Sequence, residues 1–245
     1  MHLHDIPKCI RPKFADDLVA VSVANSLSEI ESELQDATNQ LVQLAENEGM
    51  VINVEKTKVM VFGDVSNNVR VMIHKTPLEN VTSFKYLGVV LDKTLDFGMH
   101  VEYAAGKAKR ALSKMCTLIK GRQGISIKTA VDLYKSLVRP HLEYAIPAWA
   151  NISEKYLTKL ECAQSQCLKR VIGAKTHSAS SAVEVISGII PIRYRKRKLC
   201  NREYIRILTT ESCNELRRLM ESSFRAGLRF CPMEYLKLMS RELHR

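Results

Sequence analysis

The hydrophobic pattern changes its period near residue 97, and this change constrains the fold more than any other feature of the chain. Before that point, short alternating segments predict β-strands at 58–62, 69–73 and 86–91, separated by turn-forming residues. From His100 onward the apolar residues recur at helical intervals, interrupted by glycines and prolines. The sequence therefore predicts an α+β fold, in which antiparallel hairpins with one covering helix are followed by an all-α helical bundle.

Two adjacent carboxylates, Asp16 and Asp17, follow Phe14 and precede the apolar run 18–23. The run is short, rich in β-branched residues and bounded by a polar turn, so it predicts a buried strand with the carboxylates at a hairpin. Carboxylate oxygens are ligands that Mg²⁺ prefers, and many phosphoryl-transfer enzymes use two such ions. An Asp-Asp pair is more often a solvated turn or a helix N-cap, so the flanking segments decide its meaning.

An amphipathic helix is expected directly after this hairpin. Ser26 and Glu29 have the spacing of a capping box, and Gly49 supplies a C-terminal stop. The apolar residues between them recur at helical intervals, at Leu27, Ile30, Leu34, Ala37, Leu41 and Leu44. A turn and a short strand at 49–58 then bring Asn53 and Lys56 close to the helix end, which makes Lys56 a candidate phosphate contact.

Four blocks in this order resemble the reverse transcriptases of non-LTR retrotransposons, in particular jockey-like elements. The Ala-Asp-Asp box at 15–17 is followed, after the long helix, by Gly-x-x-x-Asn-x-x-Lys-Thr at 49–57. The segment 84–92 then resembles the hairpin that grips the primer strand after the palm. Finally, 133–140 and 144–149 are similar to the family's thumb and its trailing aromatic box. Ordered blocks are far more specific than any single motif.

The resemblance implies an RNA-directed DNA polymerase that adds dNTPs to a DNA primer on an RNA template, with Mg²⁺ as cofactor. Residues 1–97 are then part of the palm with the primer-grip-like hairpin, 98–150 are thumb-like helices, and 151–245 are a basic helical region. Asp16 and Asp17 are the metal ligands that the resemblance implies, and Lys56 joins them as a catalytic residue. The nucleic-acid contacts are expected at Leu87, Gly88, Lys107, Lys109, Arg110 and Lys114.

The same resemblance implies a fingers subdomain and a third catalytic aspartate, on an earlier palm strand, for which this sequence starts too late. Asp5 precedes Phe14, but its context resembles a connector of the family, so a structural role is expected. Pro12 stands where the first strand of the hairpin should be apolar, and it removes a ladder donor, so a distorted hairpin is expected. A truncated polymerase of this kind should be inactive alone, because its Mg²⁺ site is short of charge and no surface positions the nucleotide.

The composition fits a polyanionic partner. There are 37 Lys and Arg against 26 Asp and Glu, which gives a formal net charge of +11 and a sequence pI of about 9.4. The densest run is Arg193–Lys198, for which a solvated helix face, a nuclear-import signal and a phosphate-gripping patch stay open. The charge also fits an alternative hypothesis, a non-enzymatic nucleic-acid-binding remnant of a mobile element.

Other classes of function find little support in the sequence. No apolar stretch approaches the roughly 20 residues of a membrane span, so an intracellular protein, cytoplasmic or nuclear, is expected. The 7 cysteines have no paired spacing, which argues against a disulfide framework and a zinc site. Nothing indicates an oligomeric state. Core packing is expected for the aromatic side chains of Tyr134, Tyr144 and Trp149.

Overall fold

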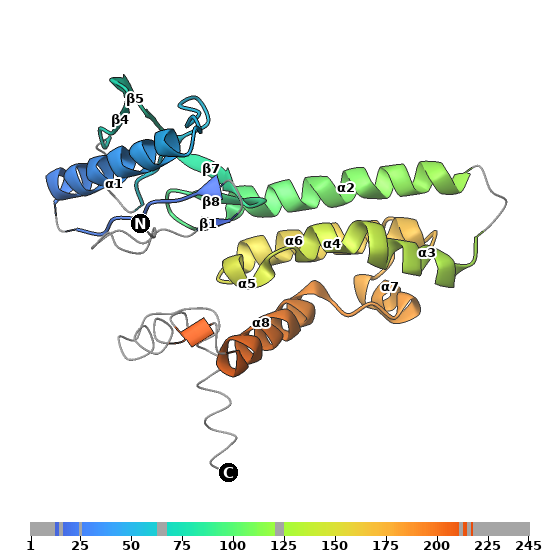
Figure 1. The fold of residues 1–245 in the computed structure, drawn as a ribbon. Coiled ribbons are helices and arrows are strands. Elements are labelled where there is room, and N and C mark those ends of the chain that lie inside the picture. Colours follow the sequence, from blue (N-terminus) through green and yellow to red (C-terminus); the bar gives the residue numbers. More distant parts are fainter. Residues whose placement is uncertain are drawn as a thin grey trace, which may run out of the picture. The chain divides into compact units, whose positions relative to one another are not determined.

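A computed structural model divides the chain into two compact units, residues 1–95 and 96–245 (Figure 1). The structure describes residues 13–14, 17–24, 26–62, 68–120, 125–210, 213–214 and 217. The first unit combines one long helix with short strands, and the second is helical, so the α+β prediction is confirmed. The described helices include none that is both long enough and apolar enough to cross a membrane.

The helix of the first unit, α1 (Leu27–Asn47), begins where its capping signal predicts. The Ser26 hydroxyl accepts a hydrogen bond from the Glu29 backbone N–H at 3.3 Å. After the helix, Gly49 takes the left-handed conformation, with φ of 70°, that usually ends a helix at glycine. The apolar face of α1 packs on a small core made by Val59, Val69, Val71, Ile73 and Leu78.

The strands of the first unit are short, and those within the described residues pair two by two. β1 (Lys13–Phe14) pairs with β2 (Asp17–Leu18), β4 (Met72–Ile73) with β5 (Thr76–Pro77), and β7 (Ser83–Tyr86) with β8 (Val89–Asp92), all antiparallel. β3 (Lys58–Val59) pairs with β6 (Glu79–Asn80) in parallel, which corrects the expectation of antiparallel hairpins alone. A parallel pair needs a long crossover connection, and residues 60–78 provide it.

The segment 69–73 alternates in burial as its sequence predicts, yet only its last two residues join a ladder. Its odd-numbered residues are buried and its even-numbered residues are exposed. Side chains of α1 bind its backbone instead. Glu31 Oε1 accepts from the Arg70 N–H at 2.7 Å, and Gln35 bonds both the N–H and the C=O of Met72 at 2.8 and 2.9 Å. These hydrogen bonds satisfy the backbone N–H groups of Arg70 and Met72 and the Met72 carbonyl, which a neighbouring strand would otherwise have to pair.

The predicted buried strand at 18–23 is wrong. In the described part of this segment the β2 ladder ends at Leu18, and Leu18, Val21 and Val23 are 42%, 40% and 85% exposed. β-branched composition produces a strand only where a neighbouring layer covers the side chains. Here the apolar face of α1 packs on the core around Val59, and α1 meets this segment through a hydrogen bond that the Ser22 hydroxyl donates to Glu33.

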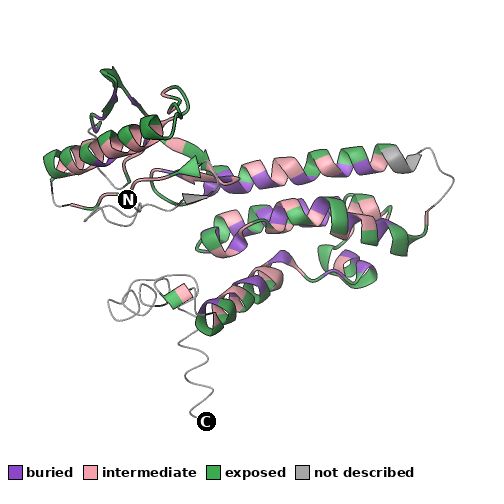
Figure 2. Ribbon diagram, in the orientation of Figure 1, coloured by how far each residue is buried: buried purple, intermediate pink, exposed green. Residues whose placement is uncertain are grey.

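The second unit is a bundle built around α2 (Gly98–Lys120) and α6 (Glu154–Val171), which lie side by side (Figure 1). Figure 2 shows buried residues along one side of each of these helices and exposed residues along the other. In chain order the other elements are α3 (Ile127–Leu133), the π-helix η1 (Tyr134–Val138), α4 (Arg139–Glu143), α5 (Ile146–Trp149), α7 (Ser180–Ser187) and α8 (Ile192–Thr209).

The π-helix has a local cause, which is Pro140. Proline lacks an N–H, and in a regular α-helix its ring would meet the carbonyl of Ser136. The chain widens before this position, so that the Arg139 N–H bonds the Tyr134 carbonyl five residues earlier. The widened turn places the side chains of Tyr134 and Val138 in the core, where both are fully buried.

Core packing is confirmed for Tyr134 and Trp149 and is wrong for Tyr144, whose side chain is 54% exposed. The left-handed backbone of Ala145, with φ of 52°, reverses the chain after α4 and turns the Tyr144 ring outward. The backbone carbonyl of Tyr144 nevertheless contacts the core, because it accepts a hydrogen bond from the indole N–H of the buried Trp149 at 2.8 Å.

Gly98 opens α2 in a tight space. Its N–H donates to Asp96 Oδ1 at 2.7 Å, and the Tyr156 hydroxyl donates to Asp96 Oδ2 at 3.2 Å, which holds the tyrosine ring over the glycine. A Cβ at Gly98 would lie 2.4 Å from that ring. In the middle of the same helix, a Cβ at Gly106 would meet only the end of the Arg110 side chain, at 3.5 Å.

We expect Gly98→Ala to lower the free energy of unfolding by about 1–3 kcal/mol, because the Tyr156 ring has to leave its position. Gly106→Ala is the matched control and should raise the free energy of unfolding by about 0.5–1 kcal/mol, since alanine favours the helix. Chemical denaturation of both variants checks this. Equal effects at the two positions would show that Tyr156 does not restrict Gly98.

His100 gives the second unit a pH dependence. Its side chain is 2% exposed and meets the Trp149 ring edge-on, with 4.8 Å between the ring centroids. Burial lowers the pKa of His100 from 6.5 to about 4. Between these two values the unfolded chain binds a proton that the folded chain does not, so folding loses stability as the pH falls through this range.

The free energy of unfolding should therefore fall by up to about 3 kcal/mol from this residue as the pH drops from 6.5 to 4. Replacing the imidazole in His100→Gln should remove this contribution and leave those of the carboxylates and the other histidines, such as His141, unchanged. Urea denaturation across the range compares the two proteins. Parallel pH profiles would contradict the assignment.

Candidate nucleic-acid interface

The β1–β2 hairpin carries the predicted carboxylate pair. Phe14 lies opposite Asp17, and Lys13 lies opposite Leu18, so the two strands flank residues 15–16. Asp17 is exposed, as predicted, because burying an unpaired carboxylate in an apolar interior is costly. Asp16 lies outside the described residues, as do Asp5 and Pro12.

The described residues do not make a Mg²⁺ site by themselves. They contain no group of three or more His, Cys, Asp or Glu side chains that could hold a metal ion. Magnesium requires near-octahedral oxygen ligation, and one exposed carboxylate does not supply it. A metal centre at this hairpin would need Asp16 and further ligands that the structure does not describe.

Lys56 lies in a turn stabilised by Asn53. Asn53 Oδ1 accepts from the Lys56 N–H at 3.0 Å, and the Thr57 hydroxyl donates to the Asn53 carbonyl at 2.8 Å. The short strand expected within 49–58 reduces to Lys58, where β3 begins. Lys56 and Asp17 are both exposed, and no ion pair joins these two described residues. The joint catalytic role of Asp16, Asp17 and Lys56 therefore stays a prediction, since Asp16 lies outside the described residues.

The β7–β8 hairpin forms where the resemblance predicts it. Phe84 pairs with Leu91 and Tyr86 pairs with Val89, so a two-residue turn connects the strands. Its residues Leu87 and Gly88 both have positive φ, 44° and 83°, which is the pattern of a type I′ turn. Glycine adopts this conformation without strain, whereas leucine does so rarely. Whether this turn grips a primer stays a prediction.

The basic residues predicted on α2 divide between two sides of the helix. Lys107, Arg110 and Lys114 recur at helical intervals with Tyr103, over whose ring Lys107 Nζ lies at 5.3 Å from the centroid. Together with burial, Lys107 and Arg110 lower the pKa of His141 on α4, so this side of α2 faces α4. Lys109 instead lies on the side that faces α6.

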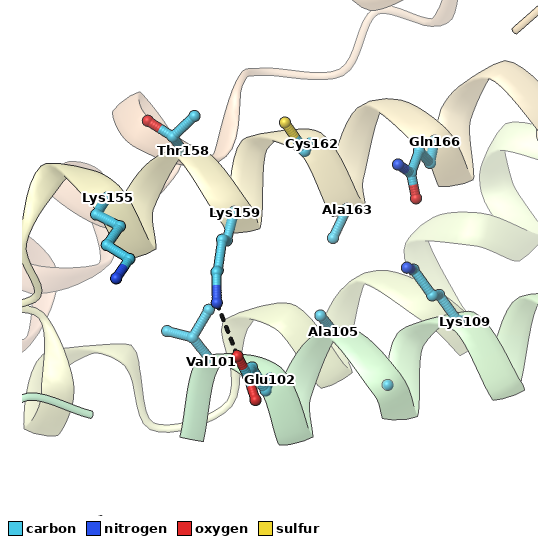
Figure 3. Close-up of a pocket in the computed structure, with 11 residues that line it drawn as sticks. Val101, Glu102, Ala105, Lys109, Lys155, Thr158, Lys159, Cys162, Ala163 and Gln166 are labelled. Atoms are coloured by element: carbon cyan, nitrogen blue, oxygen red, sulfur yellow. Dashed lines mark hydrogen bonds and ion pairs between the residues drawn. The ribbon is translucent and has the colours of Figure 1, made fainter. Parts of the chain in front are cut away.

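A groove of about 390 Å³ runs between α2 and α6, and sequence reasoning missed it (Figure 3). Lys109 enters it from α2, and Lys155 and Lys159 enter it from α6. Lys159 Nζ bonds Glu102 Oε1 at 2.7 Å. This bond lowers the pKa of Glu102 and raises that of Lys159. The spacing of Lys155 and Lys159 indicated a shared helix face, but their proximity to α2 depends on the tertiary fold.

The basic run 193–198 is largely committed to internal contacts. Arg193 bonds Glu154 and Glu161 of α6, each at 2.9 Å. Arg195 bonds Glu143 of α4 through two nitrogens at 2.9 and 3.0 Å, and Lys196 Nζ donates to a backbone carbonyl, that of Ala150, at 2.9 Å. A simple solvated helix face is therefore wrong for these three cations, which tie α8 to earlier helices.

The chain is similar to polymerases of mobile elements. It is 28% identical over 178 residues to the "RNA-directed DNA polymerase from mobile element jockey" of Drosophila melanogaster, covering 70% of this chain and 19% of that protein. It is 25% identical over 198 residues to the jockey protein of Drosophila funebris, covering 79% and 21%. A type-1 retrotransposable element R1 polyprotein of Nasonia vitripennis is 22% identical over 187 residues, which cover 73% of this chain and 46% of that protein.

The resemblance to non-LTR retrotransposon reverse transcriptases that the motifs indicate is thereby confirmed. The chain spans about a fifth of the length of the jockey relatives. No family model matches the chain. No solved structure matches it either.

The internal role of the basic run generates a prediction. Arg195→Met should lower the free energy of unfolding by about 1–3 kcal/mol, because it removes two charge-assisted hydrogen bonds to the mostly buried Glu143. Affinity for nucleic acid should change less than about twofold, since this guanidinium is already bound. Arg202→Met, on the exposed side of the same helix, is the control and should leave stability nearly unchanged. A large loss of binding at Arg195 without a loss of stability would reverse this assignment.

Proposed function

We propose that this chain, a relative of the RNA-directed DNA polymerases of non-LTR retrotransposons, forms part of the palm and the thumb of such an enzyme. The observation that carries the proposal is the order of four motifs along the chain, together with relatives that bear this name. The β-hairpin at the position of the primer grip supports it. The reaction is template-directed nucleotidyl transfer from dNTPs to a DNA primer on an RNA template.

In this proposal Asp16 and Asp17 are the carboxylates of the palm. They hold Mg²⁺ only together with a further carboxylate, because the described residues do not complete a metal site. Lys56 is proposed to contact a phosphate of the substrate, for which its exposure is suitable. The turn at Leu87 and Gly88 is proposed to contact the primer strand.

The thumb is proposed to be residues 98–150, followed by the basic helical region 151–245. Lys107, Arg110 and Lys114 form one basic stripe on α2, next to Tyr103. Such a stripe neutralises phosphates without reading base sequence, so binding is expected to weaken as salt rises. The stripe contains three of the four α2 residues that were expected to contact nucleic acid, and the fourth, Lys109, lies on the side of α2 that faces α6.

The chain alone is proposed to be inactive. It spans about a fifth of the jockey relatives' length, and template-directed synthesis needs surfaces that position the template and the incoming nucleotide. A second candidate, a non-enzymatic nucleic-acid-binding remnant, is favoured by one observation. The basic surfaces of α2 and α6 are complete within the second unit.

Primer extension on an RNA template tests the proposal. The isolated chain should extend no primer, whereas a fusion to the upstream part of the Drosophila melanogaster jockey relative should. In the fusion, Asp16→Ala and Asp17→Ala should each lower the rate by at least about a hundredfold, because positioned charge provides most of the catalysis. Asp36→Ala, which removes an exposed carboxylate on α1, is the matched control and should leave the rate unchanged.

Two outcomes would contradict the proposal. Extension by the isolated chain that Asp16→Ala abolishes would show that the fingers and a third carboxylate are dispensable. A fusion that binds primer-template but extends nothing would favour the remnant.

A further inference from the structure

The groove between α2 and α6 has a floor of small apolar residues and walls that carry charged side chains. Small side chains form the floor, namely Ala105 and Gly106 of α2 and Ala163 of α6. Lysines rise from both walls (Figure 3). A floor without large side chains leaves room for a ligand at the level of the helix backbones, and the lysines give that room a positive potential.

The charges in the groove do not cancel. Lys109, Lys155 and Lys159 contribute +3 and Glu102 contributes −1, which leaves +2. Lys159 is paired with Glu102 at 2.7 Å, whereas Lys109 and Lys155 are exposed. Gln166 adds a neutral donor on the α6 wall, whereas the Thr158 hydroxyl donates to the Glu154 carbonyl of its own helix at 2.9 Å. Lys155 lies at one end of the groove, beside Lys159, and Lys109 lies at the other end, below Gln166 (Figure 3). Exposed cations spaced along a groove suit separate phosphates of one polyanionic strand.

The size of the groove decides between a single strand and a duplex. Its volume of about 390 Å³ is that of a site for a small ligand. A duplex is far too wide to enter, since its major groove alone is about 12 Å across. One unpaired backbone running along the lysines fits, and the groove lies on a different side of α2 from the stripe of Lys107, Arg110 and Lys114.

We propose that the α2–α6 groove binds the phosphate backbone of single-stranded RNA, separately from the α2 stripe. Lys155 and Lys109 contact phosphates of one strand at the two ends of the groove, and Gln166 lies beside Lys109 as a hydrogen-bond donor. Glu102 limits the affinity, because it neutralises Lys159 and repels phosphate. The inference shares with the proposed function only the nucleic-acid partner and does not depend on polymerase activity.

Binding of labelled oligouridine by the full chain, measured by fluorescence anisotropy at several salt concentrations, tests the proposal. Lys109→Gln with Lys155→Gln should weaken binding at low salt about tenfold. It should also reduce the slope of log K against log salt by about 1.4, since each single-strand phosphate contact contributes about 0.7. Lys128→Gln with Lys175→Gln removes the same charge from exposed positions outside the groove, and should weaken binding less than about twofold with an unchanged slope.

Glu102→Gln provides a test that misfolding cannot imitate, because it predicts a gain. Freeing Lys159 should tighten binding about threefold or more and steepen the salt slope by about 0.7. The exposed Cys162 on the groove wall reports occupancy directly. Oligouridine should slow its alkylation by iodoacetamide in the unaltered chain, and Lys109→Gln with Lys155→Gln should abolish this protection.

Three results would overturn the proposal. Equal losses from both double variants would show that bulk charge alone attracts RNA. An unchanged Cys162 alkylation rate in saturating oligouridine would place RNA elsewhere. Protection by polyglutamate but not by oligouridine would assign the groove to an acidic peptide. None of these results depends on primer extension, so the proposed function stands or falls separately.

Discussion

The packing of α2 against α6 is the contact on which the rest of the second unit depends. Ala104 and Ala108 of α2 are buried with Leu160 and Ala163 of α6, and such small residues allow two helices to approach closely. α6 then positions α8, because the buried Gln164 amide donates to the Ile190 carbonyl at 3.0 Å and accepts from the Ile192 N–H at 2.6 Å. These bonds satisfy backbone groups at a helix start that would otherwise be buried without partners.

The same packing determines which cations are available to a ligand. Close approach of α2 and α6 puts Lys109, Lys155 and Lys159 around one groove with a single carboxylate. In contrast, Arg193 and Arg195 of α8 bind carboxylates, namely those of Glu154 and Glu161 for Arg193 and that of Glu143 for Arg195. A guanidinium already held by two carboxylates has to lose those bonds before it can bind phosphate. The net charge of the chain therefore does not by itself identify the surface on which a polyanionic partner would bind.

The strands of the first unit are very short, so their hydrogen-bonded ladders satisfy only a few of the backbone groups around the core. α1 contributes more than an apolar face, because Glu31 and Gln35 bind the backbone at 70–72. Asn80 does the same for Val69, with its amide donating to the carbonyl at 2.9 Å and accepting from the N–H at 3.2 Å. Polar side chains thus take the place of neighbouring strands, and the small core of valines stays covered.

Structural features that depend on interactions within a few residues could be predicted from the sequence. The Ser26 cap, the Gly49 stop and the change of period near residue 97 were all predictable on this ground. The β7–β8 hairpin was expected from the resemblance, whereas the local pattern predicted a strand over 86–91, which crosses the observed turn at Leu87 and Gly88. The resemblance to reverse transcriptases was also predictable, because the order of motifs along the chain can be read without knowing which residues contact each other. The carboxylates at 16–17 were found in the same way, although the structure describes only Asp17.

Tertiary structure alone decided which of these residues meet. Arg195 and Glu143 are 52 positions apart, and Lys159 and Glu102 are 57 apart, so no local pattern revealed that either pair exists. The exposure of Tyr144 and of Val23 depended equally on layers formed by distant segments. Burial and charge pairing are properties of three-dimensional neighbours. For this reason the sequence determined which elements form and which family they resemble, whereas the fold determined which lysines are paired and which remain exposed.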